Sequence, residues 1–197
     1  MLFGEGRDDV AHYAAQRPLA HPPGTFWSYS SGNRESGGAR RFDRHGQVGA
    51  DFEAYMRERL FGPLGMASPV PKFDAAGTFI GSSYCFAAAR DFRALRPPLS
   101  ARRRPGTAPA CLPQGWVDYA PHAHLQQSTD TGRYGAHWWL DIAGPGSFSA
   151  NGFQGQFIVV VPDRDLVIVR LGATQEDTIE SVKQWIRDIA ECFPRLG

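Results

Sequence analysis

The sequence has 197 residues, a length typical of one domain, and its 42% hydrophobic and 12% aromatic content is enough to bury a core. We therefore do not expect wholesale disorder. The formal net charge of +1 gives no long-range field that would favour DNA, RNA or an anionic membrane as a partner. No apolar run approaches the roughly 18 residues of a membrane span, so the composition favours a chain that binds neither nucleic acid nor membrane.

The start of the chain and its cysteines point to no special compartment or metal. The first residues contain neither the basic nor the apolar region of a signal peptide, so cytoplasm is the default expectation. Cys85, Cys111 and Cys192 are far apart and form no Cys-x-x-Cys pair, which leaves zinc and thioredoxin-like interpretations without support. His122 and His124 could present two metal ligands, but no third ligand is apparent. We therefore expect no metal and no other cofactor.

The first half of the chain predicts two helices. Asp9 to Gln16 is expected to be a short helix, ending before Pro18 because proline disfavours a helical residue ahead of it. Phe26 to Asn33 is expected to be extended or looped. Asp51 to Phe61 is expected to be an amphipathic helix capped by Asp51. Its apolar face consists of Phe52, Tyr55, Met56 and Leu60, spaced at helical intervals.

The second half predicts three strands and a final helix. Ala136 to Ile142 is of strand type, and Gln156 to Val161 and Leu166 to Leu171 predict a buried antiparallel hairpin. A helix is then expected to begin at Thr174, with Asp177 three residues later as in a capping box. Its apolar face consists of Ile179, Val182, Ile186, Ile189 and Phe193. This order indicates an α/β fold in which helices flank an antiparallel sheet.

Two motifs resemble one family. Pro22 to Thr25, an aromatic residue, and then Tyr29-Ser30-Ser31-Gly32 resemble the second motif of the serine β-lactamase and penicillin-binding-protein-like hydrolases. The branch concerned contains class C β-lactamases, esterases and 6-aminohexanoate-dimer hydrolases. The resemblance implies that Tyr29 is the acid/base residue and that Ser31 contacts the substrate amide. The alternative is that Tyr29 is a half-buried aromatic residue on a loop.

The second match lies between Phe148 and Gln156 and resembles the third motif of the family. Family members carry Lys-Thr-Gly or His-x-Gly where this chain has Phe153-Gln154-Gly155. The resemblance implies that this strand edge lines the active site, that Gly155 lets substrate approach the backbone, and that the N–H group of Gln156 is an oxyanion donor. Because Phe153 is uncharged, we expect a neutral amide or ester as substrate. The alternative is an ordinary strand entry beside a glycine.

A third segment, from Gly81 to Phe92, resembles a part of the family fold that borders the substrate pocket. Tyr84 is therefore a candidate substrate contact, with a packing role as the alternative.

The nucleophile of the family is missing from this sequence. A serine hydroxyl needs a base within hydrogen-bonding reach, and a tyrosine can be that base only where positive charge lowers its pKa. In the family the lysine of a Ser-x-x-Lys pair supplies this charge, from the same helix face as the serine. The chain has only two lysines, Lys72 and Lys183, and the residues three positions earlier are Pro69 and Glu180.

We therefore expect an N-terminally truncated version of the family fold. The family activity is hydrolysis of a small-molecule amide or ester through an acyl-serine intermediate. Without Ser-x-x-Lys we expect the chain to be inactive on its own, and whether it is an enzyme stays open. The alternative is a non-catalytic remnant or a partner-binding fragment. The sequence predicts no oligomeric state.

Two Arg-, Gly- and Pro-rich segments, 34–49 and 93–110, have no periodicity and depart from the family pattern. A loop is one interpretation, and neither segment has the interleaved aromatic residues of a nucleic-acid-binding patch. Only two of the 21 basic residues are lysines, which indicates GC-rich coding DNA. Our hypothesis is that 1–197 is one partial domain and that both segments are translated in an altered frame. If neither other frame restores an apolar helical pattern at both places, the hypothesis is wrong.

Overall fold

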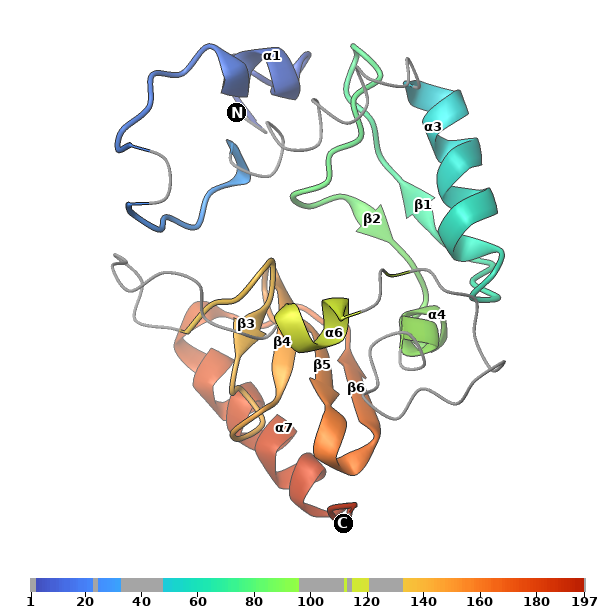
Figure 1. The fold of residues 1–197 in the computed structure, drawn as a ribbon, viewed down its shortest axis with the longest axis vertical. Coiled ribbons are helices and arrows are strands. Elements are labelled where there is room, and N and C mark those ends of the chain that lie inside the picture. The colour runs from blue at the N-terminus through green and yellow to red at the C-terminus, as the bar shows by residue number, and fades with distance from the viewer. Residues whose placement is uncertain are drawn as a thin grey trace. The chain divides into compact units, whose positions relative to one another are not determined.

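The chain forms two compact units (Figure 1). The computed structural model describes residues 3–22, 25–32, 48–95, 112, 115–120 and 133–196. The first unit contains the described residues up to 63 together with 67–87. The second contains 64–66 and the described residues from 88 onward. The segments 34–49 and 93–110 lie outside the described residues except for 48–49 and 93–95.

The first helix of unit 1, α1 (Val10–Ala15), confirms the expected helix at this position. Asp9 caps it, because its side chain accepts a hydrogen bond of 2.9 Å from the backbone N–H of His12. Asp74 ties the helix start to a later turn. Its carboxylate accepts 2.8 Å and 2.7 Å hydrogen bonds from the backbone N–H groups of Val10 and Thr78.

The second helix of this unit departs from the expected one in three ways. α3 (Gly49–Met56) begins after Val48, so Asp51 lies in the first turn and is not the cap. The helix then continues as a π-helical segment, η1 (Arg57–Phe61). This wider turn rotates the chain by one residue, so Phe61 is the buried residue in place of Leu60. Tyr55, predicted on the buried face, is exposed.

A short antiparallel pair, β1 (Val70–Pro71) and β2 (Cys85–Phe86), completes the regular structure of unit 1. The aromatic rings of Phe52, Phe73 and Phe79 pack together beside it, with centroids 5.9 to 6.5 Å apart. Burial raises the pKa of the Cys85 thiol above its usual range.

Unit 2 contains a four-stranded antiparallel sheet with strand order β3-β4-β5-β6. Its strands are β3 (Trp139–Leu140), β4 (Phe148–Gly152), β5 (Gln156–Val161) and β6 (Leu166–Arg170). The predicted hairpin is confirmed, because Phe157 pairs with Arg170 and Val161 with Leu166. The unit also contains the short helices α4 (Ala89–Phe92), η2 (Arg93–Leu95), α6 (Trp116–Tyr119), η3 (Pro162–Arg164) and η4 (Glu176–Thr178).

The strand predicted from Ala136 to Ile142 is wrong except at its centre, where β3 spans two residues. His137 and Asp141 adopt left-handed backbone conformations, with φ of 68° and 66°. Such residues cannot continue an extended strand, and they end the pairing on both sides. A pattern of apolar and aromatic residues carries no signal of these two backbone turns.

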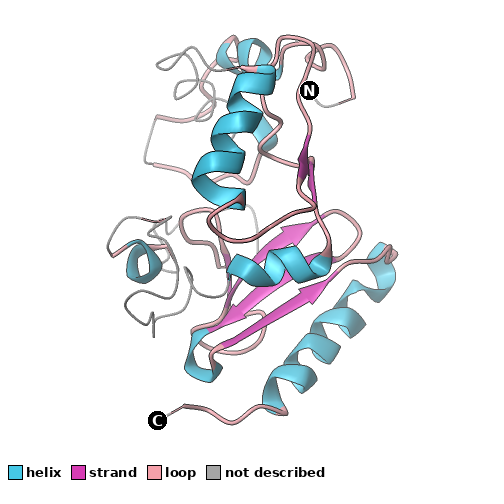
Figure 2. Cartoon of the chain, turned by 90° about the vertical axis from the view of Figure 1, so that its right-hand side faces the viewer, coloured by secondary structure: helices cyan, strands magenta, loops and turns pink. Residues whose placement is uncertain are grey.

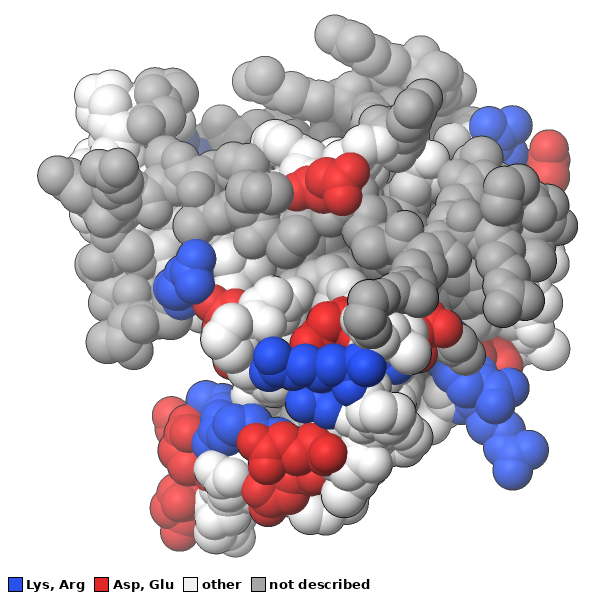
Figure 3. All heavy atoms as spheres, turned by 60° about the horizontal axis from the view of Figure 1, so that its bottom comes forward, with Lys and Arg blue, Asp and Glu red and all other residues white. Residues whose placement is uncertain are grey.

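Charged side chains are mixed on the face drawn in Figure 3. Acidic and basic groups of the described residues lie close to one another there, and neither sign forms a continuous patch. In the part of the chain that the structure describes, no helix is both long and apolar enough to cross a bilayer.

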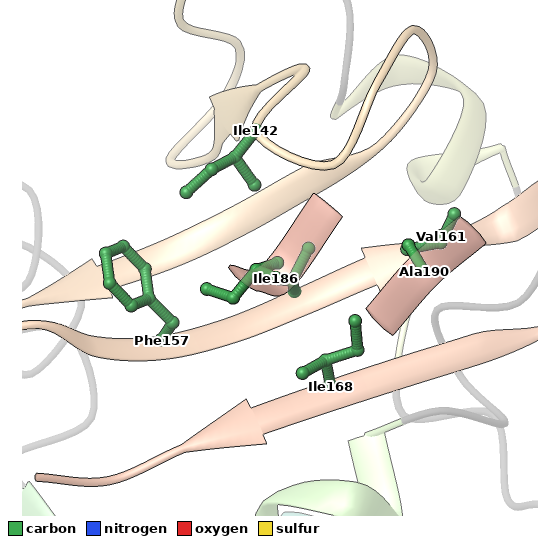
Figure 4. Packing of buried hydrophobic residues seen from close by; sticks show 7 residues of the cluster. Ile142, Phe157, Val161, Ile168, Ile186 and Ala190 are labelled. Carbon is green, nitrogen blue, oxygen red and sulfur yellow. The ribbon is translucent and has the colours of Figure 1, made fainter. Parts of the chain in front are cut away.

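The last helix, α7 (Ile179–Glu191), covers one face of the sheet (Figure 2). Ile186 and Ala190 are buried against the side chains of the strands (Figure 4). The core cluster consists of Ile142, Phe157, Val159, Val161, Ile168, Ile186 and Ala190. Phe193, predicted on this face, follows the helix and is exposed. On the opposite face of the sheet Phe148 and Val160 are buried.

The predicted cap of this helix is also wrong. The residue before α7 is Thr178, while Thr174 precedes η4. The Thr174 hydroxyl accepts a hydrogen bond from the guanidinium of Arg170, and its backbone N–H donates to the carbonyl of Gln154 at 3.0 Å. Thr174 therefore fastens the segment before the helix to the sheet.

Candidate active site

Tyr29 lies on an extended segment of unit 1 that passes into a helical turn at Ser31 and Gly32. Its side chain is 40% exposed, and its ring lies 6.5 Å from that of Trp27. The preceding turn is closed by hydrogen bonds from the backbone N–H and hydroxyl of Thr25 to the carbonyl of Pro22. The Tyr29 side chain is thus partly exposed, and Ser31 is half-buried two residues later.

Tyr84 is half-buried just before β2. Its ring stacks on Phe86 at 6.2 Å and meets the edge of Phe3 at 6.5 Å. Its backbone carbonyl accepts a 2.8 Å hydrogen bond from the N–H of Lys72. These contacts favour the packing role over the substrate contact.

Phe153-Gln154-Gly155 was expected to lie at a strand edge. In unit 2 these residues instead form the turn that joins β4 to β5. Gly152 pairs with Gln156 at its base. Gln154 and Gly155 both have positive φ, 55° and 78°. This sharp turn leaves the Phe153 ring 85% exposed.

Arg170 fixes this turn from the end of β6. Its guanidinium donates 2.7 Å hydrogen bonds to the carbonyls of Gly155 and Gly172 and a further bond to the hydroxyl of Thr174. The Gln156 side chain completes the arrangement, because its amide donates to the Gly172 carbonyl at 2.7 Å and its oxygen accepts from the Gly172 N–H at 2.9 Å. Hydrogen bonds from the Arg170 and Gln156 side chains therefore join the turn to the segment 172–174.

The roles of the Arg170 and Gln156 side chains were not predicted from the sequence. The signal was present in the pattern, because these are polar residues at the same end of an apolar hairpin, one on each strand. A buried hairpin end leaves backbone groups that need partners, and long polar side chains placed there can supply them.

Gly155 lies against the ends of two side chains, which a β-carbon at this position would displace. A β-carbon at this position would lie 2.8 Å from Cδ1 of Ile179 and 2.9 Å from Nη1 of Arg170. The space next to this glycine is therefore filled by side chains of the same unit. The turn brings Phe153, Gly155 and Gln156 together, whereas Tyr29, Ser31 and Tyr84 belong to unit 1.

Metal ligands do not gather in the described part of the chain, where no three His, Cys, Asp or Glu side chains form a group. His122 and His124 lie outside the described residues.

The chain belongs to the Beta-lactamase family, whose model matches residues 3–191. No curated protein sequence matches it.

Solved structures of three proteins share the fold. A protein assigned as a 6-aminohexanoate-dimer hydrolase from Bacillus anthracis is 19% identical, with a TM-score of 0.72 over 94% of this chain and 50% of that chain. SurE with D-Leu is 18% identical, with a TM-score of 0.70 over 96% and 50%. A β-lactamase from Mycobacterium bovis is 20% identical, with a TM-score of 0.58 over 93% and 73%. These matches confirm the predicted fold class, and the chain spans half the length of the first two structures.

Proposed function

We propose that this chain carries part of the active site of a β-lactamase-related serine hydrolase that acts on a small-molecule amide or ester. The observation that carries the proposal is the family match over residues 3–191, which includes both motifs. The partly exposed side chain of Tyr29 supports its role as the acid/base residue.

The proposed reaction passes through an acyl-serine. The serine Oγ attacks the substrate carbonyl while the side-chain oxygen of Tyr29 takes the hydroxyl proton. The N–H of Gln156 donates a hydrogen bond to the oxyanion that forms. The bond to the leaving nitrogen or oxygen then breaks, and Tyr29 returns the proton to it. Water then attacks the acyl carbonyl while Tyr29 takes a proton from it, and the bond to the serine Oγ breaks as Tyr29 returns that proton to the serine. Ser31 contacts the substrate amide before this bond is cleaved.

The third-motif turn supports a neutral substrate. Phe153, at the position of the charged or imidazole side chain in the family, is apolar and 85% exposed. The guanidinium of Arg170 directs its donors at the carbonyls of Gly155 and Gly172. Neither group is arranged to receive a substrate carboxylate.

The absence of a Ser-x-x-Lys pair limits the chemistry that this chain can carry out alone. Neither lysine of the 197 residues has a serine three positions earlier, so the chain supplies no Ser-x-x-Lys nucleophile. We infer that it has no hydrolase activity by itself. The same observation favours a second candidate function, a non-catalytic or partner-binding form of the fold.

An activity assay tests the proposal. We expect the purified chain to hydrolyse neither nitrocefin nor p-nitrophenyl esters above the rate of a Tyr29→Phe control. Turnover that survives rigorous purification and disappears in Tyr29→Phe would contradict the inferred inactivity.

A complementation assay separates the two candidates. Adding a polypeptide that supplies the Ser-x-x-Lys part of the family fold should restore hydrolysis that depends on Tyr29. Restored hydrolysis that is unchanged by Tyr29→Phe would contradict the role of this tyrosine, and no restoration would favour the non-catalytic candidate.

A further inference from the structure

The turn from Phe153 to Gly155 is held by a side chain from the end of β6. The guanidinium of Arg170 donates 2.7 Å hydrogen bonds to the carbonyls of Gly155 and Gly172 and a third bond to the Thr174 hydroxyl. A charged donor makes stronger hydrogen bonds than a neutral one. All three acceptors are uncharged, so these donors fix the backbone of the turn and of the segment after β6.

The backbone of this turn needs such support. Gln154 is not a glycine, yet its φ of 55° lies in the left-handed region. A residue in this sparsely populated region persists only where its surroundings fix it, and such residues gather at functional sites. The carbonyl of Gln154 accepts a 3.0 Å hydrogen bond from the N–H of Thr174 and lies 3.4 Å from Nη1 of Arg170. Arg170 therefore holds Gln154 both directly and through Thr174.

The same turn presents the ring of Phe153, which is 85% exposed. Because the next two residues are fixed by their contacts, the direction in which the Phe153 side chain leaves the turn is fixed as well. A side chain on a backbone that is already ordered loses less conformational freedom when a ligand binds, and this favours binding. The contacts of Arg170 therefore prepare an apolar ring for contact with a ligand.

We propose that Arg170 is a positioning residue that acts through Phe153, and that Phe153 contacts the apolar part of a neutral amide or ester. This inference rests on the proposed hydrolase function. The Phe153 ring carries no charge or hydrogen-bonding group that could respond to the reacting carbonyl, so its contact is equally strong in the ground state and the transition state. Loss of such a contact raises KM and leaves kcat nearly unchanged. Substitution of Arg170 should therefore have the same kinetic signature as removal of the Phe153 ring.

Hydrogen exchange of the chain by itself tests whether Arg170 holds the turn. The matched control is Arg164, at the opposite end of the β5–β6 hairpin, which also donates to a backbone carbonyl, that of Phe193. In Arg170→Met the amide of Thr174 should exchange about tenfold faster, because its acceptor on Gln154 is released. In Arg164→Met it should exchange as in the unmodified chain. Equal exchange in the two variants would overturn the proposal.

Steady-state kinetics tests whether Arg170 acts through Phe153. The enzyme is this chain together with a polypeptide that supplies the Ser-x-x-Lys part of the family fold, and the substrate is p-nitrophenyl butyrate, a neutral ester. Arg170→Met and Phe153→Ala should each raise KM about fivefold or more and change kcat less than about twofold, whereas Arg164→Met should change neither. In the Phe153→Ala background, Arg170→Met should have no further effect on KM. A general loss of structure would instead lower activity in both backgrounds.

The outcomes separate this inference from the proposed function. No hydrolysis by the complemented, unmodified chain would overturn both. Hydrolysis with the same KM in Arg170→Met and Arg164→Met would overturn only the positioning role, as would effects of Arg170→Met and Phe153→Ala that simply add. If Arg170→Met does not fold, Thr174→Val takes its place, because it removes one acceptor of Arg170 and keeps the shape of the side chain. It should raise KM in the same way but less, and an unchanged KM would overturn the role.

Discussion

Gly155 connects the third-motif turn to the core of unit 2. Its φ of 78° lies in the left-handed region that favours glycine, and Ile179 and Arg170 occupy the space where a side chain would be. The neighbouring Phe153 is exposed on the same turn. The position of this candidate site group therefore depends on a glycine that meets two separate constraints, one of backbone conformation and one of packing.

A pair of alanine substitutions separates these constraints. Gly146→Ala meets only the backbone constraint, because Gly146 has a φ of 83° with nothing within 4 Å of its added β-carbon, and it should cost about 1–2 kcal/mol. Gly155→Ala adds a clash with Ile179 and Arg170 and should cost about 2–4 kcal/mol in total. Denaturant unfolding measures both losses. Equal losses would show that packing around Gly155 is unimportant.

At the scale of elements, periodicity predicted the parts that are held by one continuous apolar face. β5, β6 and α7 follow their predicted positions closely because burial of alternating or helically spaced apolar residues dictates them. The boundaries failed where a long-range partner decides the structure. Thr174 does not cap the helix because Arg170 takes its hydroxyl, and β3 is short because His137 and Asp141 turn the backbone.

For the candidate site, the sequence predicted which residues to consider but not how they are arranged. The motifs indicated Tyr29 and Phe153 as residues of interest, but local sequence does not say that Phe153 lies on a turn fixed by Arg170. That arrangement comes from the pairing of β5 with β6, which places residues far apart in the sequence side by side.

The packing of α7 gives a prediction at the same scale. Ile186 is fully buried against the sheet, and the adjacent Trp185 is 53% exposed. Ile186→Ala should lower the free energy of unfolding by about 2–5 kcal/mol, since it leaves a cavity in the core. Trp185→Ala should cost about 1 kcal/mol or less, although it removes the larger side chain. Thermal and denaturant unfolding of both variants checks this order, and a larger loss for Trp185→Ala would contradict the assigned face of the helix.

At the scale of the whole molecule, this chain has the fold of its family but spans half the length of two of the structures it matches. Its sequence contains two segments that resemble family motifs, one at Tyr29 and one at Phe153–Gly155, but no Ser-x-x-Lys pair. Acyl-enzyme chemistry needs a nucleophile and an activating base together. The chain therefore belongs to the family, but we do not expect it to catalyse hydrolysis alone.

Intact-protein mass spectrometry after incubation with a fluorophosphonate probe and, separately, a penicillin tests this expectation most directly. Both reagents form covalent adducts with an activated serine, so the measurement does not depend on turnover or on knowing the substrate. The account predicts that the mass of the purified chain stays unchanged with both reagents. A stoichiometric adduct on a serine of this chain, lost in Tyr29→Phe, would contradict it.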